Sequence, residues 1–266
     1  MTETTLLRIE QRDDIVLLQL DRAQQRNSLN DPFIAELGAF FDAPPPGMRA
    51  VVLHAAGDHF CAGLDLKQIL AQPPRNAIEG HRRSRAWHRV FEQMQFGEVP
   101  VVSVLKGAVV GGGLELAAAT HVRVAESTAF FQLPEGQRGI FVGGSGSVRI
   151  PRIIGAGRMV EMMLTGRSYD AQEGLQLGLA HYVTPPGQGL ERALELARQI
   201  ASNAATSNYA VINAISRIAD MGFAEGLMTE NFVVSTTGAD AAKRIQGFFA
   251  ARKGPAATPT DPTDPT

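Results

Sequence analysis

Residues 111–119 read Gly-Gly-Gly-Leu-Glu-Leu-Ala-Ala-Ala, and Leu-Pro-Glu follows at residues 133–135. Three successive glycines have no Cβ, so a ligand can approach their backbone N–H groups within hydrogen-bonding distance. The apolar run after them predicts a helix that the glycines open. Glu115 and Glu135 would then provide acid and base groups beside a site for an oxyanion. A flexible helix start with a solvated glutamate is the simpler alternative, which these letters alone leave open.

Apolar runs of strand length lie on both sides of this stretch. Runs that are bounded by turn residues are typical of strands buried on both faces of a parallel sheet. Two runs near the N-terminus, separated by a polar turn, predict a β-hairpin. The predicted strands are Leu6–Ile9, Ile15–Leu20, Arg49–Ala55, Val101–Leu105, Val122–Ala125 and Ala129–Phe131.

Capping residues and helical spacing indicate the remaining elements. Asn30 or Asp31 can cap a helix with Pro32 in its first turn. Strand, strand and helix then recur about every forty to fifty residues, and the chain becomes all-helical near residues 184–189. The later predicted helices are 65 onward, 78–96, 113–119, 144–150, 156–164, 170–177, 190–201, 206–219, 223–235 and 240–252.

Composition excludes several classes of protein. With 266 residues the chain can bury roughly three quarters of its unfolded surface, as one large domain or two small ones. A net charge of −2 argues against nucleic acid as a partner, and interrupted apolar runs argue against a membrane span. A single cysteine, Cys61, and an N-terminus without an apolar signal segment favour a reducing, cytoplasmic location. We expect small molecules or copies of the chain itself as partners.

Seven blocks of the sequence, in order and spacing, resemble the crotonase or enoyl-CoA hydratase/isomerase superfamily, most closely its enoyl-CoA hydratases. The resemblance covers roughly residues 6–253. The blocks are residues 26–30 (Arg-Asn-Ser-Leu-Asn), 57–67 (Gly-Asp-His-Phe-Cys-Ala-Gly-Leu-Asp-Leu-Lys), 100–107 (Pro-Val-Val-Ser-Val-Leu-Lys-Gly), 108–116, 131–135 (Phe-Gln-Leu-Pro-Glu), 164–167 (Leu-Thr-Gly-Arg) and 171–179.

The resemblance implies an α/β fold, a crotonase-type spiral of ββα repeats with a C-terminal helical region. Residues 1–188 would form the spiral core with the active site, and residues 189–253 a helical trimerisation region. Residues 254–266, rich in Pro and Thr, are expected to be a disordered tail. Such proteins assemble as trimers or dimers of trimers and bind acyl-coenzyme A thioesters. No separate cofactor is expected, because coenzyme A enters as part of the substrate.

The same resemblance assigns roles to four residues at the centre of the site. The backbone N–H groups of Leu64 and Gly112 would hold the thioester oxygen, where an enolate develops. Family members that hydrate carry two glutamates, which match Glu115 and Glu135 here. By analogy, Glu115 would hold and activate the water, and Glu135 would deliver the proton to Cα.

Further residues match positions that surround the substrate or its coenzyme A in the family. Gly143 occupies a position at a helix start that faces the water, although residues 142–147 read Val-Gly-Gly-Ser-Gly-Ser in place of Pro-Gly-Ala-Gly-Gly-Thr. Asp65 is expected to cap a helix. For each basic residue of the group, a solvated surface charge is the alternative. The predicted substrate- and CoA-binding residues are Arg26, Ala62, Asp65, Lys67, Gly111, Gly143 and Lys253.

Other catalytic motifs do not fit the letters. Residues 143–147 lack the last glycine of a Gly-x-Ser-x-Gly nucleophile elbow, and residues 107–114 lack the Lys-Ser/Thr of a P-loop. Cys61 stands where the family needs only a small residue. Since the six histidines show no ligand spacing, no metal is predicted.

Arginines gather on the predicted helix over residues 75–89, a feature that the resemblance does not explain. One interpretation is a solvated helix face. The other is that one arginine reaches the acyl pocket and pairs with a polar or anionic acyl tail.

The sequence therefore predicts a lyase, an enoyl-CoA hydratase that adds water reversibly to a trans-2-enoyl thioester. Two alternatives on the same fold are an enoyl-CoA isomerase, which needs only one carboxylate, and a hydrolase of a thioester or a carbon–carbon bond. A non-catalytic or RNA-binding relative would need a degraded site or a basic surface, and the sequence has neither.

Overall fold

The structure of the protein is a computed structural model that describes residues 5–71 and 76–252. The chain divides into two units, Met1–Asn213 and Ala214–Thr266, and each is described on its own. Lys253 and the predicted tail at residues 254–266 lie outside the described residues.

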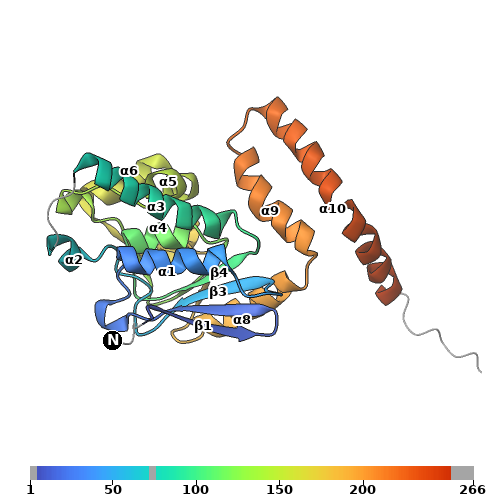
Figure 1. Ribbon diagram of the computed structural model, residues 1–266, viewed down its shortest axis with the longest axis horizontal. Coiled ribbons are helices and arrows are strands. Elements are labelled where there is room, and N and C mark those ends of the chain that lie inside the picture. Colours follow the sequence, from blue (N-terminus) through green and yellow to red (C-terminus); the bar gives the residue numbers. More distant parts are fainter. Residues whose placement is uncertain (1–4, 72–75, 253–266) are drawn as a thin grey trace, which may run out of the picture. The chain divides into compact units, whose positions relative to one another are not determined.

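The first unit is built on a mixed sheet, to which six strands of the described residues contribute (Figure 1). The two N-terminal strands form the predicted antiparallel hairpin, and each later neighbour is parallel. The strands, in spatial order, are β1 (Leu7–Arg12), β2 (Ile15–Leu20), β3 (Ala50–Ala55), β4 (Val101–Leu105), β6 (Val122–Glu126) and β9 (Tyr182–Thr184).

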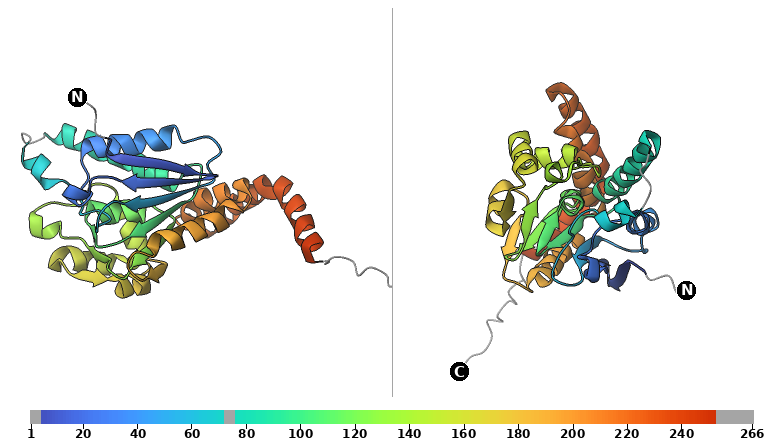
Figure 2. Two further views of the ribbon diagram at one scale, coloured as in Figure 1. Left: turned by 90° about the horizontal axis from the view of Figure 1, so that it is seen from below. Right: turned by 90° about the vertical axis from the view of Figure 1, so that its left-hand side faces the viewer.

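Both faces of this sheet are covered, as Figures 1 and 2 show. Because side chains alternate along a strand, Leu18 and Leu53 belong to the core that contains α1 (Asp31–Asp42) and α3 (Ala77–Gln95). Their neighbours in sequence, such as Val52, pack with α8 (Gly189–Ala201) on the other face. This double burial explains why β2 to β4 read as continuous apolar runs.

A smaller sheet contains β5 (Ala108–Val110), β7 (Phe130–Gln132) and β8 (Ser168–Asp170). Helix α4 (Gly112–Ala118) begins directly after β5, and every one of its residues is buried. A bridge between Cys61 and Val109 attaches the loop after β3 to this sheet. The edge of the small sheet therefore brings the glycine-rich helix start next to residues 61–65.

Two helix caps are residues that the sequence predicts. Asn30, one of the two predicted caps, accepts a hydrogen bond from the Phe33 N–H at 2.9 Å and so caps α1. Asp65 caps α2 (Leu66–Leu70) in the same way, as predicted. The remaining helices are α5 (Gly146–Ile154), α6 (Ala156–Thr165), α7 (Ala171–Leu177) and α9 (Ala205–Ile218).

The second unit contains α10 (Phe223–Arg252), one continuous helix where the sequence predicts two. The prediction of a break between residues 235 and 240 is wrong. The hydroxyls of Ser235 and Thr236 donate to the carbonyls of Phe232 and Val233, so these residues bond within the helix.

Three short strands differ from the sequence-based expectation. Of the three-residue strands, β7 overlaps a predicted strand, whereas β5, β8 and β9 are missing from the prediction, because so few residues show no clear periodicity. The first unit ends at Asn213, and its helix α8 packs against the sheet. Among the described residues, no helix is both long and apolar enough to cross a membrane.

Candidate active site

Two backbone N–H groups, those of Leu64 and Gly112, lie close together where the loop after β3 meets the start of α4. The nitrogen of Leu64 lies 3.7 Å from the position that a Cβ would take at Gly112. Neither N–H donates a hydrogen bond to a described residue. An isolated parallel β-bridge between Leu29 and Leu64 holds this loop in place. The Leu29 N–H donates to the Gly63 carbonyl, and the Leu29 carbonyl accepts from the Asp65 N–H. Two N–H groups that lie this close, with no partner among the described residues, form an arrangement suited to binding an oxygen atom.

Gly111 shapes this corner through its backbone conformation. Its φ is +53°, and a Cβ there would lie 2.5 Å from Oε1 of Glu135. Only glycine is both unstrained at this φ and small enough for that approach. The first glycine of the triplet therefore makes room for a carboxylate, whereas the second, Gly112, offers its N–H.

Glu115 projects from the first turn of α4 and is only 3% exposed. Its Oε1 accepts hydrogen bonds from the N–H groups of Gly144, at 2.9 Å, and Gly146, at 2.7 Å. Burial raises the pKa of Glu115 to about 7, and the nearby charge of Glu135 adds to this, against the two N–H donors and the Arg149 guanidinium. The group can thus exchange a proton near neutral pH.

Glu135 follows β7 through Leu133 and Pro134 and is 6% exposed. Its Oε2 is buried and has no hydrogen-bond partner among the described residues. Burial raises the pKa of Glu135 above its ordinary value. A buried carboxyl without a partner for one oxygen is uncommon in a purely structural role, because it loses hydration without compensation.

These groups line one cavity of about 220 Å³. The backbone of Leu64 and Gly112 and the carboxyls of Glu115 and Glu135 form one part of its wall. The rest comes from α3 and from the loop before α5. The described residues of that second part are Gly80, Arg83, Ser84, Trp87, Ile140, Phe141, Val142, Gly143 and Gly144.

Side chains of α3 contact the backbone of the turn at Gly143. Its carbonyl accepts a hydrogen bond from the Ser84 hydroxyl at 2.7 Å, and Nε2 of His88 lies 3.0 Å from the same oxygen. This anchors the loop that delivers the N–H groups of Gly144 and Gly146 to Glu115. The sequence does not predict these contacts.

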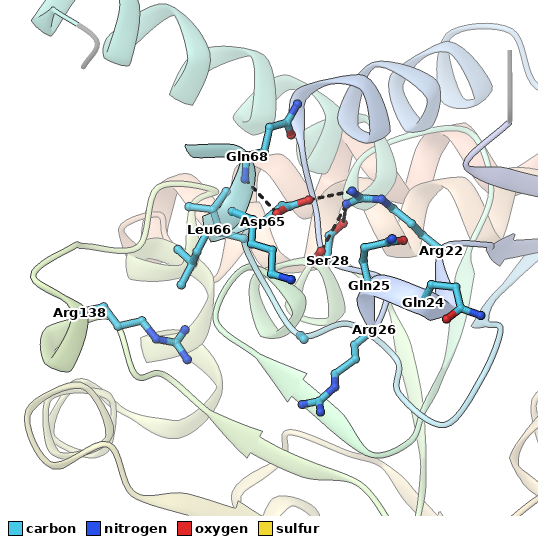
Figure 3. A pocket seen from close by; sticks show the side chains of 12 residues that line it. Arg22, Gln24, Gln25, Arg26, Ser28, Asp65, Leu66, Gln68 and Arg138 are labelled. Carbon is cyan, nitrogen blue, oxygen red and sulfur yellow. Dashed lines mark hydrogen bonds and ion pairs between the residues drawn. The ribbon is translucent and has the colours of Figure 1, made fainter. Parts of the chain in front are cut away.

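A larger cavity of about 710 Å³ adjoins the first and shares Leu64 with it (Figure 3). Figure 3 shows Arg26 and Arg138 reaching toward this opening from different walls. Arg22 instead pairs with Asp65 at 2.7 Å, which fixes the cap of α2. The cavity thus combines basic side chains with Leu64, the residue that it shares with the smaller cavity.

The structure brings most of the predicted site residues to one of these two cavities. The smaller cavity is lined by Leu64, Gly112, Glu115, Glu135 and Gly143. Gly111 does not line it but lies next to the Glu135 carboxyl. The larger holds Arg26, Ala62, Leu64, Asp65 and Lys67. Lys253 lies outside the described residues.

Sequence reasoning missed Gly144, Gly146 and Arg138. The first two sit at the start of α5, where glycines expose N–H groups just as they do at residues 111–113, so the same signal was present. No pattern in the sequence indicates Arg138, because its position depends on the turn after Glu135.

Two further chemistries find no support in the described part of the chain. It contains no group of three or more His, Cys, Asp or Glu side chains that could hold a metal ion. Cys61 is buried, and burial raises the pKa of its thiol to about 12, so the reactive thiolate is scarce.

The fold is that of solved enoyl-CoA hydratases. A candidate enoyl-CoA hydratase from Rhodopseudomonas palustris superposes with a TM-score of 0.88 at 45% identity, and the match covers 93% of this chain and 96% of the other. The predicted α/β spiral with its C-terminal helices is thereby confirmed as the fold class.

The chain belongs to the enoyl-CoA hydratase/isomerase family, whose profile matches residues 10–256. Relatives include the short-chain-enoyl-CoA hydratase of Clostridium acetobutylicum, 28% identical over 90% of this chain and 96% of that protein. The fatty acid oxidation complex subunit alpha of Shewanella frigidimarina is 34% identical over 72% of this chain. The match covers only 28% of that longer subunit. The sequence-based recognition of the family is confirmed.

Proposed function

We propose that the protein is an enoyl-CoA hydratase that adds water reversibly to a trans-2-enoyl-CoA thioester. The observation that carries this proposal is the meeting, in one cavity, of two buried carboxyls and two backbone N–H groups that donate to no described residue. Family membership and the names of the relatives support it. No separate cofactor is proposed, since coenzyme A arrives with the substrate.

The N–H groups of Leu64 and Gly112 bind the thioester oxygen in this mechanism. When a nucleophile adds at Cβ, negative charge moves to that oxygen, and two preorganised donors stabilise it. Losing one such donor in other enzymes costs about 10²- to 10³-fold in kcat. The Leu64 side chain takes no part in this step, because the donor is its backbone.

Glu115 and Glu135 complete the addition. Glu115, as a carboxylate, takes a proton from water while the water oxygen bonds to Cβ. The electron pair of the Cα=Cβ bond shifts toward the thioester, and Glu135, protonated, gives its proton to Cα. The raised pKa values of both groups support a pair that keeps one proton near neutral pH. In the reverse direction the same groups exchange roles.

The larger cavity would hold the nucleotide part of coenzyme A. Arg26 and Lys67, together with Arg138, offer positive charge to its phosphates. We assign Asp65 the indirect role of fixing the loop, through its cap of α2 and its ion pair with Arg22. Ala62 lines the same cavity without a polar side chain.

Mass spectrometry in oxygen-18 water separates the hydratase from an isomerase on the same fold. Incubation with crotonyl-CoA is expected to yield a labelled 3-hydroxyacyl product, whereas an isomerase incorporates no label and a hydrolase labels a free acid. The variants Glu115→Gln and Glu135→Gln should each lose about 10²- to 10⁴-fold in turnover. Glu98→Gln, an exposed control, should not. Full turnover by both site variants would overturn the two-carboxylate mechanism.

Self-association as a trimer or a dimer of trimers, through residues 189–253, is a further proposal. Its support is the series of large apolar side chains that α10 exposes in the isolated chain: Phe223, Leu227, Met228, Phe232, Val234, Ile245, Phe248 and Phe249. Light scattering of the purified protein measures the oligomer directly. Cytoplasmic location, with neither membrane nor nucleic acid as partner, is likewise proposed, and cell fractionation would test it.

A further inference from the structure

One face of α3 forms the far wall of the cavity that contains Glu115 and Glu135. Gly80, Arg83, Ser84 and Trp87 line this cavity, at the spacing i, i+3, i+4 and i+7 that places residues on one side of a helix. Ser84 is engaged with the Gly143 carbonyl. The side chains that an acyl group would meet from this wall are thus an indole and a guanidinium.

Trp87 limits the depth of the cavity. Its Cζ3 lies 3.6 Å from the position of a Cβ at Gly112, and its Cε3 lies 3.3 Å from that position at Gly144. The indole is 4% exposed, and its Nε1 donates to Asp31 at 3.3 Å. The ring therefore closes one side of a cavity of only about 220 Å³, a volume that favours a short acyl group.

Arg83 is held beside this indole in one orientation. Its Nε donates to Oδ1 of Asp31 at 2.6 Å, and its Cζ lies 4.8 Å from the centroid of the Trp87 ring. The Arg83 side chain is 21% exposed. Its two Nη atoms donate to no described residue, although a guanidinium can bind a carboxylate through both of them at once. Arg83 therefore lines the cavity of Glu115 and Glu135, and also a cavity of about 470 Å³ along α1 and α3, with a fixed guanidinium whose Nη donors are available.

The carboxyl groups near the cavity do not occupy the Nη atoms of Arg83. Asp31 engages Nε of Arg83 and Nε1 of Trp87 and leaves the Nη pair available. Glu115 and Glu135 carry raised pKa values, because burial suppresses their negative charge. An anionic group at the α3 wall therefore faces reduced repulsion from the two glutamates.

We propose that Arg83 recognises a carboxylate at the far end of a short acyl group, so that the preferred thioesters are monothioesters of short dicarboxylic acids. The inference rests on the proposed function, in which coenzyme A occupies the larger cavity and its acyl group extends into the smaller one. An acyl group of the same length that ends in a methyl group would leave the Nη atoms without a partner.

Binding of saturated thioesters tests this without any turnover. The dissociation constants of glutaryl-CoA and pentanoyl-CoA, which have equal numbers of acyl carbons, are measured by titration calorimetry on the full chain. The wild type is expected to bind glutaryl-CoA at least about tenfold more tightly, the value of a charge-assisted bidentate contact. Arg83→Met should remove this preference and leave the affinity for pentanoyl-CoA within about threefold.

Arg85→Met is the matched control, because Arg85 is an exposed arginine on the same helix that lines none of the described cavities. It should keep the wild-type preference. Equal affinities of the wild type for the two thioesters, or a preference that survives in Arg83→Met, would overturn the inference. The two experiments can fail separately. Glutaryl-CoA and pentanoyl-CoA have no double bond to hydrate, so their binding tests Arg83 alone, whereas the oxygen-18 assay tests whether the protein is a hydratase.

Discussion

The Glu115 carboxylate lies directly against the backbone of Gly146, whose N–H donates to Oε1 at 2.7 Å. A Cβ at residue 146 would lie 2.7 Å from Cγ of Glu115, so the close approach depends on glycine. The contact joins the start of α5 to the first turn of α4 and fixes one carboxylate oxygen. In the proposed mechanism, the other oxygen is then free to orient water.

The first prediction concerns Gly146→Ala. The added methyl group must displace the Glu115 side chain, and a displacement of about 1 Å in a reacting group can cost ~10²-fold in rate. We expect kcat for crotonyl-CoA hydration to fall by roughly that factor while butyryl-CoA still binds.

Gly157→Ala is its control. Gly157 lies in α6, and nothing lies within 4 Å of a Cβ built there, so activity should be unchanged. Thermal denaturation of both variants separates lost activity from lost folding. Unchanged kcat in Gly146→Ala would show that the exact place of the Glu115 carboxylate is unimportant.

The second prediction is a bell-shaped pH dependence of kcat/KM. Glu115, whose pKa burial raises to about 7, must be ionised to act as base, so activity should fall on the acid side of the optimum. Glu135, whose pKa burial also raises, must be protonated to act as acid, so activity should fall on the alkaline side as well. Both apparent pKa values belong to the pair. A kcat/KM that is flat from about pH 5 to 9 would contradict the assignment.

The third prediction concerns stability. The pKa of Glu115 is raised from 4.5 to about 7 in the folded protein, so between these values the folded state binds more protons than the unfolded chain. The unfolding free energy of the wild type therefore falls as pH rises through this window. Glu115→Gln lacks this titration, and above pH 7 it should be more stable by up to about 3 kcal/mol.

Chemical denaturation at pH 5 and pH 8 measures this difference. The advantage of Glu115→Gln should be small at pH 5 and largest at pH 8. Glu98→Gln, the same exchange at an exposed position, supplies the control and is measured at the same two pH values. An advantage of Glu115→Gln that does not grow with pH would mean that the buried carboxyl is not the cause.

The fourth prediction concerns the larger cavity. Arg26→Met and Arg138→Met should each raise KM for crotonyl-CoA about tenfold, because each removes a charge offered to the phosphates. KM for the N-acetylcysteamine thioester of the same acid, which has no nucleotide, should change little. Arg85→Met serves again as the surface control. Equal effects on both thioesters would show that these arginines act on folding.

Much of the site could be predicted because its residues are close in sequence to strong local signals. The glycine triplet before an apolar helix predicts accessible N–H groups at residues 111–113, among which the family resemblance implies Gly112 as the donor, and Asp65 is recognisable as a cap. Gly144 and Gly146 carried the same glycine signal, yet their partner Glu115 lies about thirty residues away and no local rule connects them. The position of Arg83 beside Trp87 follows from helical spacing, but its orientation depends on Asp31 in another helix.

The sequence by itself determined the order of most strands and helices, the family, and the residue types that the chemistry needs. The elements follow from periodicity, capping and glycine conformation, which act over a few residues, and the family follows from the resemblance of several short blocks of sequence. Only the tertiary structure decided that Glu115 and Glu135 are buried in one cavity, with raised pKa values, and that Trp87 and Arg83 form its far wall. Burial and electrostatic coupling depend on how distant segments pack, which no local pattern of residues specifies.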